Sequence, residues 1–232
     1  MKTDLCTIPI EDIFAPKDGC PICRMRDILE QRGCEYSTGA AVMEPDVRIR
    51  MNELGFCNRH YAQMLKGSHR LQVALGLSTR LDELDKTLFG GKFIKPSPQK
   101  RAYRCARVHD TCFVCEKVED AMEHFFNTLF RLYANDGEFA QSFREQSSLC
   151  IPHYGLLLTY GEKMLDKKTF AAFCTDAEAL TRKTLTALRE DVTHFTKMYD
   201  YRNNTPDADW GNSKDSIERA VRFLTGFEKG EE

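Results

Sequence analysis

The chain has 232 residues, with 33 lysines and arginines against 35 aspartates and glutamates, and a formal net charge of −2. This near balance argues against a dedicated nucleic-acid-binding protein, which usually carries a large basic excess. Hydrophobic residues make up 42% of the chain, which is enough for a sizeable core. The first residues lack the apolar segment of a secretory signal, and no apolar run is long enough to cross a bilayer, so we expect a cytoplasmic protein without membrane contact.

Apolar residues recur at helical spacing, and no segment alternates in the way that a β-strand does. A helix is expected after Pro45, ending at Gly55. Apolar positions predict longer helices over about 70–88, 114–133 and 167–201, and shorter ones over 22–31, 58–66 and 151–160. Ile217, Val221 and Leu224 mark the apolar face of a short amphipathic helix near the end of the chain. The sequence therefore predicts an all-α protein.

One set of cysteine and histidine motifs occurs twice. A C-x2-C pair is followed, after 33 residues in the first copy and 34 in the second, by C-x2-H-Y. The first copy contains Cys20, Cys23, Cys57 and His60, and the second contains Cys112, Cys115, Cys150 and His153. Two copies in nearly constant register indicate an internal duplication.

The segment from Gly90 to Pro98 contains two glycines and two prolines, which cannot continue a helix. We therefore predict a first helical module at 1–90, a Gly/Pro linker at 91–99 and a second helical module at 100–202. Residues 203–232 would form a loop and the C-terminal amphipathic helix. About four helices are expected in each module.

The repeated residues suit a soft metal ion. In C-x2-H, residues i and i+3 lie on one helical face and can reach one atom, and Zn²⁺ favours a tetrahedron such as Cys3His. With all four positions filled by protein, each site would be structural, so two zinc ions per chain are predicted, with iron–sulfur as the less favoured alternative. Ligands could be exchanged between the copies, but equal spacing favours sites within a copy. The predicted sets are Cys20, Cys23, Cys57 and His60, and Cys112, Cys115, Cys150 and His153.

No nucleophile, base and orienting group can be placed together, so a non-enzymatic scaffold or adaptor for an unknown protein partner is expected. The alternative is a thiol-based redox or metal sensor whose zinc–thiolate sites respond to oxidation. A basic run between Lys92 and Arg107 fits a solvated linker or a contact for an anionic partner; with Tyr103 as its single aromatic, it is a weak platform for nucleic acid. The cysteines without a repeated partner are expected to be small buried apolar residues, and these are Cys6, Cys34, Cys105 and Cys174.

The chain resembles an uncharacterised bacterial family, a domain of unknown function common in Gram-positive anaerobes. The resemblance rests on the doubled motifs, on the segment from Met198 to Arg202, and on the ending that begins with Trp210-Gly211 and runs from Lys214 to Gly226. It spans essentially the whole chain. The resemblance implies a cytosolic, helical, metal-binding protein and brings no established activity.

Overall fold

The protein is helical throughout the part of the chain that a computed structural model describes, which is residues 10–90, 95–203, 205 and 208–226. This confirms the predicted all-α class. No helix within these ranges is both long and apolar enough to span a membrane. The elements in chain order are α1 (Ile10–Phe14), α2 (Pro21–Thr38), the 3₁₀ helix η1 (Ala40–Met43), α3 (Pro45–Leu54), α4 (Asn58–Lys66), α5 (Arg70–Phe89), α6 (Pro98–Asp110), α7 (Phe113–Asn135), α8 (Gly137–Arg144), α9 (Ile151–Met164), α10 (Lys167–Met198) and α11 (Ser216–Thr225).

Helix α6 lies partly where the sequence predicts the linker 91–99. Pro98 occupies the first turn of α6, and the Ser97 side chain caps the helix by accepting a hydrogen bond from the backbone N–H of Lys100. Proline is favoured at that position because its missing N–H has no partner inside the helix. The proline interpreted as a break is therefore the start of a helix, and the basic residues after it are helical. Residues 91–94 of the predicted linker lie outside the described residues.

The helices form two compact units, and the boundaries between the units fall inside α2 and α7. The first unit contains residues 28–123, and the second contains residues 10–27 together with the chain from 124 onwards. The predicted modules 1–90 and 100–202 are therefore not the compact units. Helices α2 and α7 each begin in one unit and end in the other, so each unit takes chain from both halves of the sequence.

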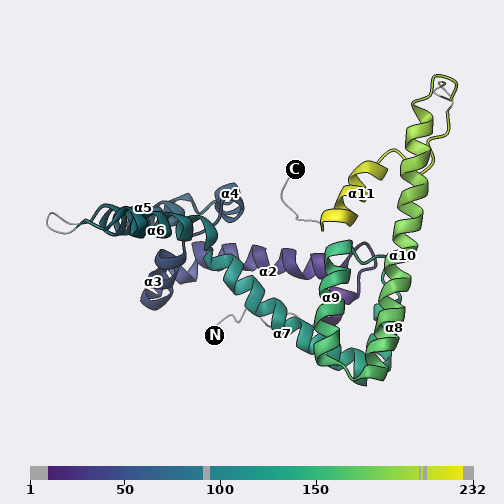
Figure 1. Cartoon of the computed structure of the whole chain (residues 1–232), viewed down its shortest axis with the longest axis horizontal. Coiled ribbons are helices and arrows are strands. Elements are labelled where there is room, and N and C mark those ends of the chain that lie inside the picture. Colours follow the sequence, from purple (N-terminus) through teal and green to yellow (C-terminus); the bar gives the residue numbers. More distant parts are fainter. Residues whose placement is uncertain (1–9, 91–94, 204, 206–207, 227–232) are drawn as a thin grey trace. The chain divides into compact units, whose positions relative to one another are not determined.

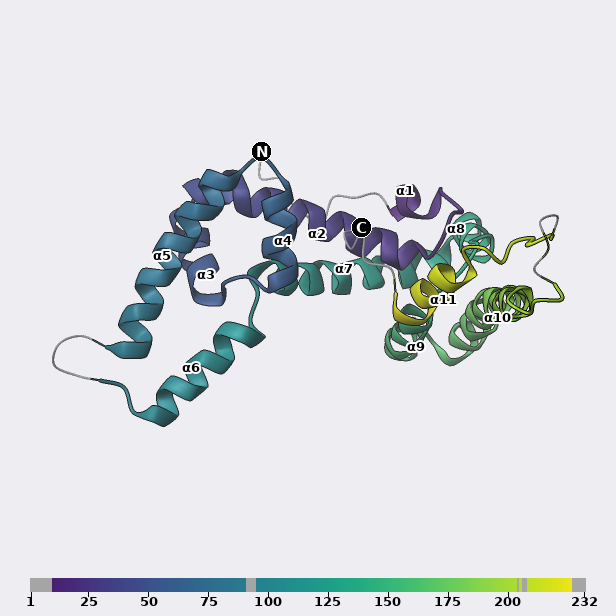
Figure 2. The same ribbon diagram turned by 90° about the horizontal axis from the view of Figure 1, so that it is seen from above.

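In the first unit, α3 and α4 pack against α5, and α6 returns along α5 (Figure 2). Gly33 of α2 allows a close approach to α7, because a Cβ at that position would lie 2.8 Å from Cγ1 of Val114. The apolar face predicted for 70–88 is only partly used: Val73 is buried, whereas Leu81 is 63% exposed. The periodic leucines of α5 thus do not form the centre of this unit.

In the second unit, the short connection between α9 and α10 makes them an antiparallel pair (Figure 1). Helix α8 packs against α10 and α1. The core is aromatic, and Phe173 makes ring contacts at 5.0–5.2 Å with Phe130, Tyr133 and Phe143. Burial of several aromatic side chains at one place stabilises this unit.

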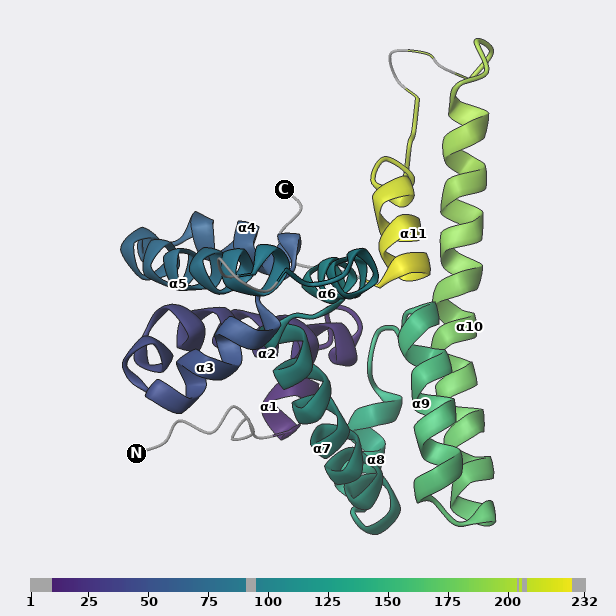
Figure 3. The ribbon, with the colours of Figure 1, turned by 60° about the vertical axis from the view of Figure 1, so that its left-hand side comes forward.

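Helix α11 lies against α10 and α9 in the second unit (Figure 3). The helix itself is where the sequence predicts it, but the predicted face is wrong. Ile217, Val221 and Leu224 are 45%, 53% and 58% exposed, whereas Phe223 is only 5% exposed. The ion pair between Arg219 and Asp191 of α10, at 3.0 Å, lies on the packed side together with Phe223 and fixes which side faces the unit.

Candidate metal centres

Each motif lies at the beginning of a helix. Cys57 and Cys150 are the N-cap residues of α4 and α9. Cys20 and Cys112 directly precede the first residues of α2 and α7. The backbone carbonyl of each of these four cysteines accepts a hydrogen bond from the N–H four residues later, at 2.8–3.2 Å. The positive end of the helix dipole favours a thiolate at this position. The motifs thus lie at the starts of the helices that the sequence predicts over 22–31, 58–66, 114–133 and 151–160.

The first centre joins the starts of α4 and α7 and lies wholly within the first unit. Nδ1 of His60 is 3.3 Å from Sγ of Cys57, 3.2 Å from Sγ of Cys112 and 3.6 Å from Sγ of Cys115. The sulfur atoms of Cys57 and Cys115 are 3.9 Å apart. His60 is fully buried, whereas Cys57 and Cys115 are half-buried.

The second centre joins the starts of α2 and α9 and lies wholly within the second unit. Nδ1 of His153 is 3.7 Å from Sγ of Cys20, 3.3 Å from Sγ of Cys23 and 3.1 Å from Sγ of Cys150. The sulfur atoms of Cys23 and Cys150 are 3.7 Å apart. In both centres the histidine presents the same ring nitrogen, Nδ1, to the three sulfur atoms.

These spacings agree with a tetrahedral metal ion. With Zn–S bonds of about 2.3 Å and Zn–N bonds of about 2.05 Å, the edges of a regular tetrahedron are about 3.8 Å between two sulfurs and about 3.6 Å between sulfur and nitrogen. All four ligand atoms of each centre lie within 4.8 Å of one another. A disulfide would require sulfur atoms about 2.05 Å apart, so the sulfur–sulfur distances of 3.7 and 3.9 Å fit shared ligation rather than a covalent bond.

The structure corrects the predicted grouping of the ligands. All eight predicted residues are present in the two centres, but each C-x2-C pair joins the C-x2-H of the other copy. The first centre is Cys57, His60, Cys112 and Cys115, and the second is Cys20, Cys23, Cys150 and His153. The alternative of exchanged ligands is thus the observed one, and the equal spacing within each copy was not evidence about which pairs meet.

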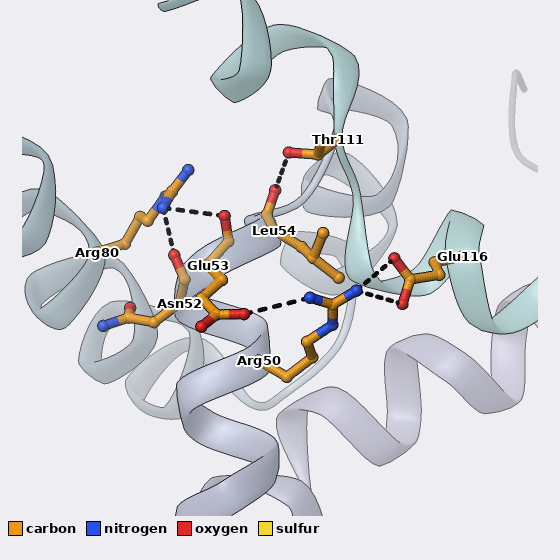
Figure 4. A network of polar contacts seen from close by, with 7 residues as sticks. All are labelled: Arg50, Asn52, Glu53, Leu54, Arg80, Thr111 and Glu116. Atoms are coloured by element: carbon orange, nitrogen blue, oxygen red, sulfur yellow. Dashed lines mark hydrogen bonds and ion pairs between the residues drawn. The ribbon is translucent and has the colours of Figure 1, made fainter. Parts of the chain in front are cut away.

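A set of polar contacts in the first unit explains why Cys112 meets Cys57 (Figure 4). The Thr111 hydroxyl donates to the carbonyl of Leu54 at 2.7 Å. The backbone N–H of Phe113 also donates to the carbonyl of Gly55, at 2.9 Å. Arg50 of α3 forms an ion pair with Glu116 of α7 at 2.8 Å. These bonds tie the residues around the second C-x2-C to α3 and to Gly55, which lie two to seven residues before Cys57.

The end of α3 is itself fixed by α5. Arg80 donates from its guanidinium group to the carbonyls of Asn52 and Glu53, which have no partner inside the helix (Figure 4). Gly55 then leaves the helix with φ of +65°, a conformation that glycine adopts without steric strain. The chain is thereby turned so that Cys57 can begin α4.

Corresponding contacts hold the second centre. The amide of Gln146 donates to the carbonyl of Phe14 at 2.7 Å, and the Lys17 ammonium donates to the carbonyl of Ser142 at 2.9 Å. These bonds tie the chain before Cys20 to the chain before Cys150. In each unit, therefore, hydrogen bonds to backbone carbonyls bring one motif beside the other.

The histidines of the two centres have different surroundings. The Nε2 atom of His60 is buried without a hydrogen-bond partner among the described residues, and a carboxylate oxygen of Glu30 lies 4.0 Å from it. Glu30 is 5% exposed and forms an ion pair with Arg59 at 2.9 Å. A carboxylate behind a metal-binding histidine orients the ring and raises its basicity. No ion pair to the His153 ring occurs in the part of the chain that the structure covers.

Without a metal ion, the thiols within one centre compete for ionisation. In the first centre, hydrogen bonding from the Cys115 thiol is the main cause that lowers the pKa of Cys112 to about 3, while the bond to Cys112, together with burial, raises the pKa of Cys115. In the second centre, burial opposes ionisation of Cys20, but hydrogen bonds from Cys150, Cys23 and His153 outweigh it and lower its pKa. The pKa of Cys23 is raised by hydrogen bonds to the neighbouring cysteines. Three thiolates side by side need a compensating cation, which a divalent metal supplies.

The other cysteines lie outside both centres. Cys34 is buried, as the sequence predicts, but Cys105 of α6 is exposed and Cys174 of α10 is half-exposed. Cys105 departs from the expectation because α6 has no buried residue. Cys6 lies outside the described residues.

Glu30 is a functional candidate that sequence reasoning missed, because no motif includes it and only the packing of α2 brings it to His60.

No curated protein and no solved structure matches this chain. One family model matches residues 1–231, and its description is a family of unknown function, DUF6062. That match covers the whole fold described above, including both centres and α11. The chain therefore belongs to the DUF6062 family, whose activity is unknown.

Proposed function

We propose that the protein binds two zinc ions and serves as a non-enzymatic scaffold or adaptor. The observation that carries the proposal is the geometry of the two centres: in each, three sulfurs and one imidazole nitrogen lie within 4.8 Å of one another, and the sulfur–nitrogen distances are 3.1–3.7 Å. Soft thiolate ligands favour zinc or iron over magnesium and calcium. A complete set of four protein ligands leaves no position for a reacting water, which supports a structural role.

Exchange of the ligands gives each metal a long-range structural role. In the first centre, His60 and Cys112 are separated by 52 residues, and in the second, Cys23 and Cys150 are separated by 127 residues. A structural zinc site contributes on the order of 10 kcal/mol of binding free energy, which becomes folding free energy when the unfolded chain lacks the site. Each ion would thus connect the two motif copies and set the spacing of helices that present a surface to a partner.

Elemental analysis of the purified protein tests the proposal. We expect about two zinc ions per chain, and Cys57→Ser and Cys150→Ser should each remove about one. Cys105→Ser is the matched control, because Cys105 is exposed and lies outside both centres; it should retain both metals. Protein without metal, or with iron and the brown colour of a cluster, would contradict the zinc assignment.

A pair of double variants tests the exchanged grouping. Cys57→Ser with Cys112→Ser removes two ligands of one centre and should cost about one metal. Cys23→Ser with Cys57→Ser removes one ligand from each centre and should cost both. If ligands came from within one motif copy, these two results would be reversed.

A thiol-based sensor is the second candidate. It is favoured by the half-exposed sulfur positions of Cys57 and Cys115, which an oxidant could reach. Mild peroxide treatment with a zinc-responsive dye distinguishes the two functions. Zinc release at doses that leave Cys34 unmodified would support the sensor, and complete retention would leave the scaffold.

We further propose a cytoplasmic location, because clusters of unpaired thiols persist in a reducing compartment. A protein partner is expected to be captured in stoichiometric amount by the full-length, metal-loaded chain. An adaptor should lose that partner after chelation if the metals set the geometry of its surface. Retention of the partner by chelated, unfolded protein would argue against this.

A further inference from the structure

The second centre has a helix packed over it. Phe223 of α11 belongs to one buried cluster with Cys23, Cys150 and Leu188, and Cys20 packs against that cluster. The end of α11 reaches the same place, because a Cβ added at Gly226 would lie 4.0 Å from Sγ of Cys150. Access to the sulfur atoms of this centre therefore depends on the position of α11.

A cavity of about 670 Å³ lies beside this centre within the second unit. Its lining includes Cys20, Cys23 and Cys150 on one side, and Arg219, Arg222 and Phe223 of α11 on the other. Volumes of this order accommodate small-molecule ligands. A ligand in the cavity would contact residues that hold the metal and residues of the covering helix at the same time.

Helix α11 buries few side chains in its unit. The helix has 10 residues, too short to be stable alone in water, and its buried residues are Ser216 and Phe223. Its ion pair to α10 is partly exposed, with the Arg219 side chain 31% accessible. Elements with little buried apolar surface open at lower free energy than the core does. Helix α11 is therefore suited to separate from α10 while the aromatic core of the unit remains folded.

We propose that a small thiol enters this cavity and replaces a protein cysteine as a ligand of the metal in the second centre, which leads to release of the metal. Helix α11 controls the rate of this ligand exchange. The thiol sulfur binds the metal as one protein cysteine dissociates, and the proton of the incoming thiol passes to the displaced cysteine sulfur. No electron is transferred, so no oxidant is needed. The inference rests on the proposed function, because it requires a metal in the second centre.

The first centre supplies an internal comparison. Cys57 and Cys115 are half-buried, and none of the four ligand residues of the first centre comes from α11. Metal release from the first centre should consequently be independent of α11. A perturbation of Phe223 should act on one metal out of two.

The test uses the full-length, zinc-loaded protein with 2-mercaptoethanol as the thiol and a chromogenic chelator to report free zinc. Phe223→Ala should accelerate the release of one zinc equivalent by about tenfold or more, because truncation of a buried phenylalanine weakens the attachment of the helix. Among the cysteines of the two centres, alkylation with iodoacetamide followed by mass spectrometry should modify Cys20, Cys23 and Cys150 faster in Phe223→Ala than in the wild-type protein. The exposed Cys105, which lies outside both centres, should react at the same rate in both proteins. Leu224→Ala is the matched control, because the Leu224 side chain is next to Phe223 in sequence but is 58% exposed. This variant should leave the rate of zinc release unchanged.

Phe223→Leu keeps an apolar side chain and is a second, milder test in case Phe223→Ala does not fold. Its rate of zinc release should lie between those of the wild-type protein and Phe223→Ala. Unchanged release from the second centre in a folded Phe223 variant, equal acceleration at both centres, or release that does not respond to the thiol would overturn the proposal. Elemental analysis of the wild-type protein before the release experiment separates the proposed zinc-binding function from the proposed role of α11. Fewer than two metals contradicts the proposed function, whereas two metals with unaltered release contradicts only the role of α11.

Discussion

Glu30 provides a quantitative test of how the first centre is supported. Its carboxylate is buried and lies 4.0 Å from the ring nitrogen of His60 that faces away from the cysteines. With a metal bound at Nδ1, the Nε2 atom carries the proton and becomes a buried donor. Glu30→Gln keeps the size of the side chain and removes its charge, so the metal-bound imidazole loses the carboxylate beside its Nε2 atom.

The expected loss follows from that distance. Two unit charges 4 Å apart interact by about 4 kcal/mol at an effective dielectric constant of 20. The imidazole N–H carries only part of a charge, so we expect a loss of about 1.4–2.7 kcal/mol, or 10–100-fold in affinity, as is typical when such a supporting carboxylate is removed. The loss should be confined to one of the two metals.

Competition titration with a chelator of known affinity measures both metals. Glu35→Gln is the matched control, because Glu35 lies on the same helix, is exposed, and its carboxylate accepts a hydrogen bond from the Gln31 side chain at 2.9 Å. Arg59→Gln removes the ion pair to Glu30 but leaves the carboxylate beside His60, which separates the two contacts. Unchanged affinity in Glu30→Gln, or a loss at the second centre instead, would refute this account.

Two further predictions concern stability. In α9, Gly155→Ala should stabilise the protein by up to about 1 kcal/mol, because alanine favours a helix and nothing lies within 4 Å of the added Cβ. Gly161→Ala should be about 1–3 kcal/mol less stable than Gly155→Ala, because its Cβ would lie 3.2 Å from the Phe130 ring. Thermal unfolding of the two variants measures the difference. Burial, with a hydrogen bond to Asp176, raises the pKa of Tyr133. The folded state therefore keeps a proton that the unfolded chain loses above about pH 10, so stability should fall as pH rises from there. Tyr133→Phe should weaken that alkaline fall, and an equally steep fall in the variant would contradict the assignment.

The sequence by itself determined the helical class and the ligand residues. Spacing of i and i+3 at a helix start places Cys57 with His60, and Cys150 with His153, whatever the rest of the chain does. Proline in the first turn and glycine at the end likewise specify α3 locally. These features were predictable because each depends on residues within one or two turns of one another.

Contacts on one helix face were harder to predict. Ile217, Val221 and Leu224 satisfy helical periodicity, yet the buried apolar residue of α11 is Phe223. Periodicity identifies an amphipathic helix, but it does not show which face of the helix will pack against other helices. The role of Glu30 depends in the same way on a helix brought to His60 from elsewhere in the chain.

Only the tertiary structure decided which motifs come together in one centre. The two C-x2-C pairs are chemically equivalent, as are the two C-x2-H pairs, so local chemistry cannot distinguish a partner in the same copy from one in the other. The choice is made by contacts distant in sequence, such as Thr111 with Leu54 and Gln146 with Phe14. Helices α2 and α7 each pass from one unit to the other and so place every C-x2-C pair beside the histidine of the opposite copy.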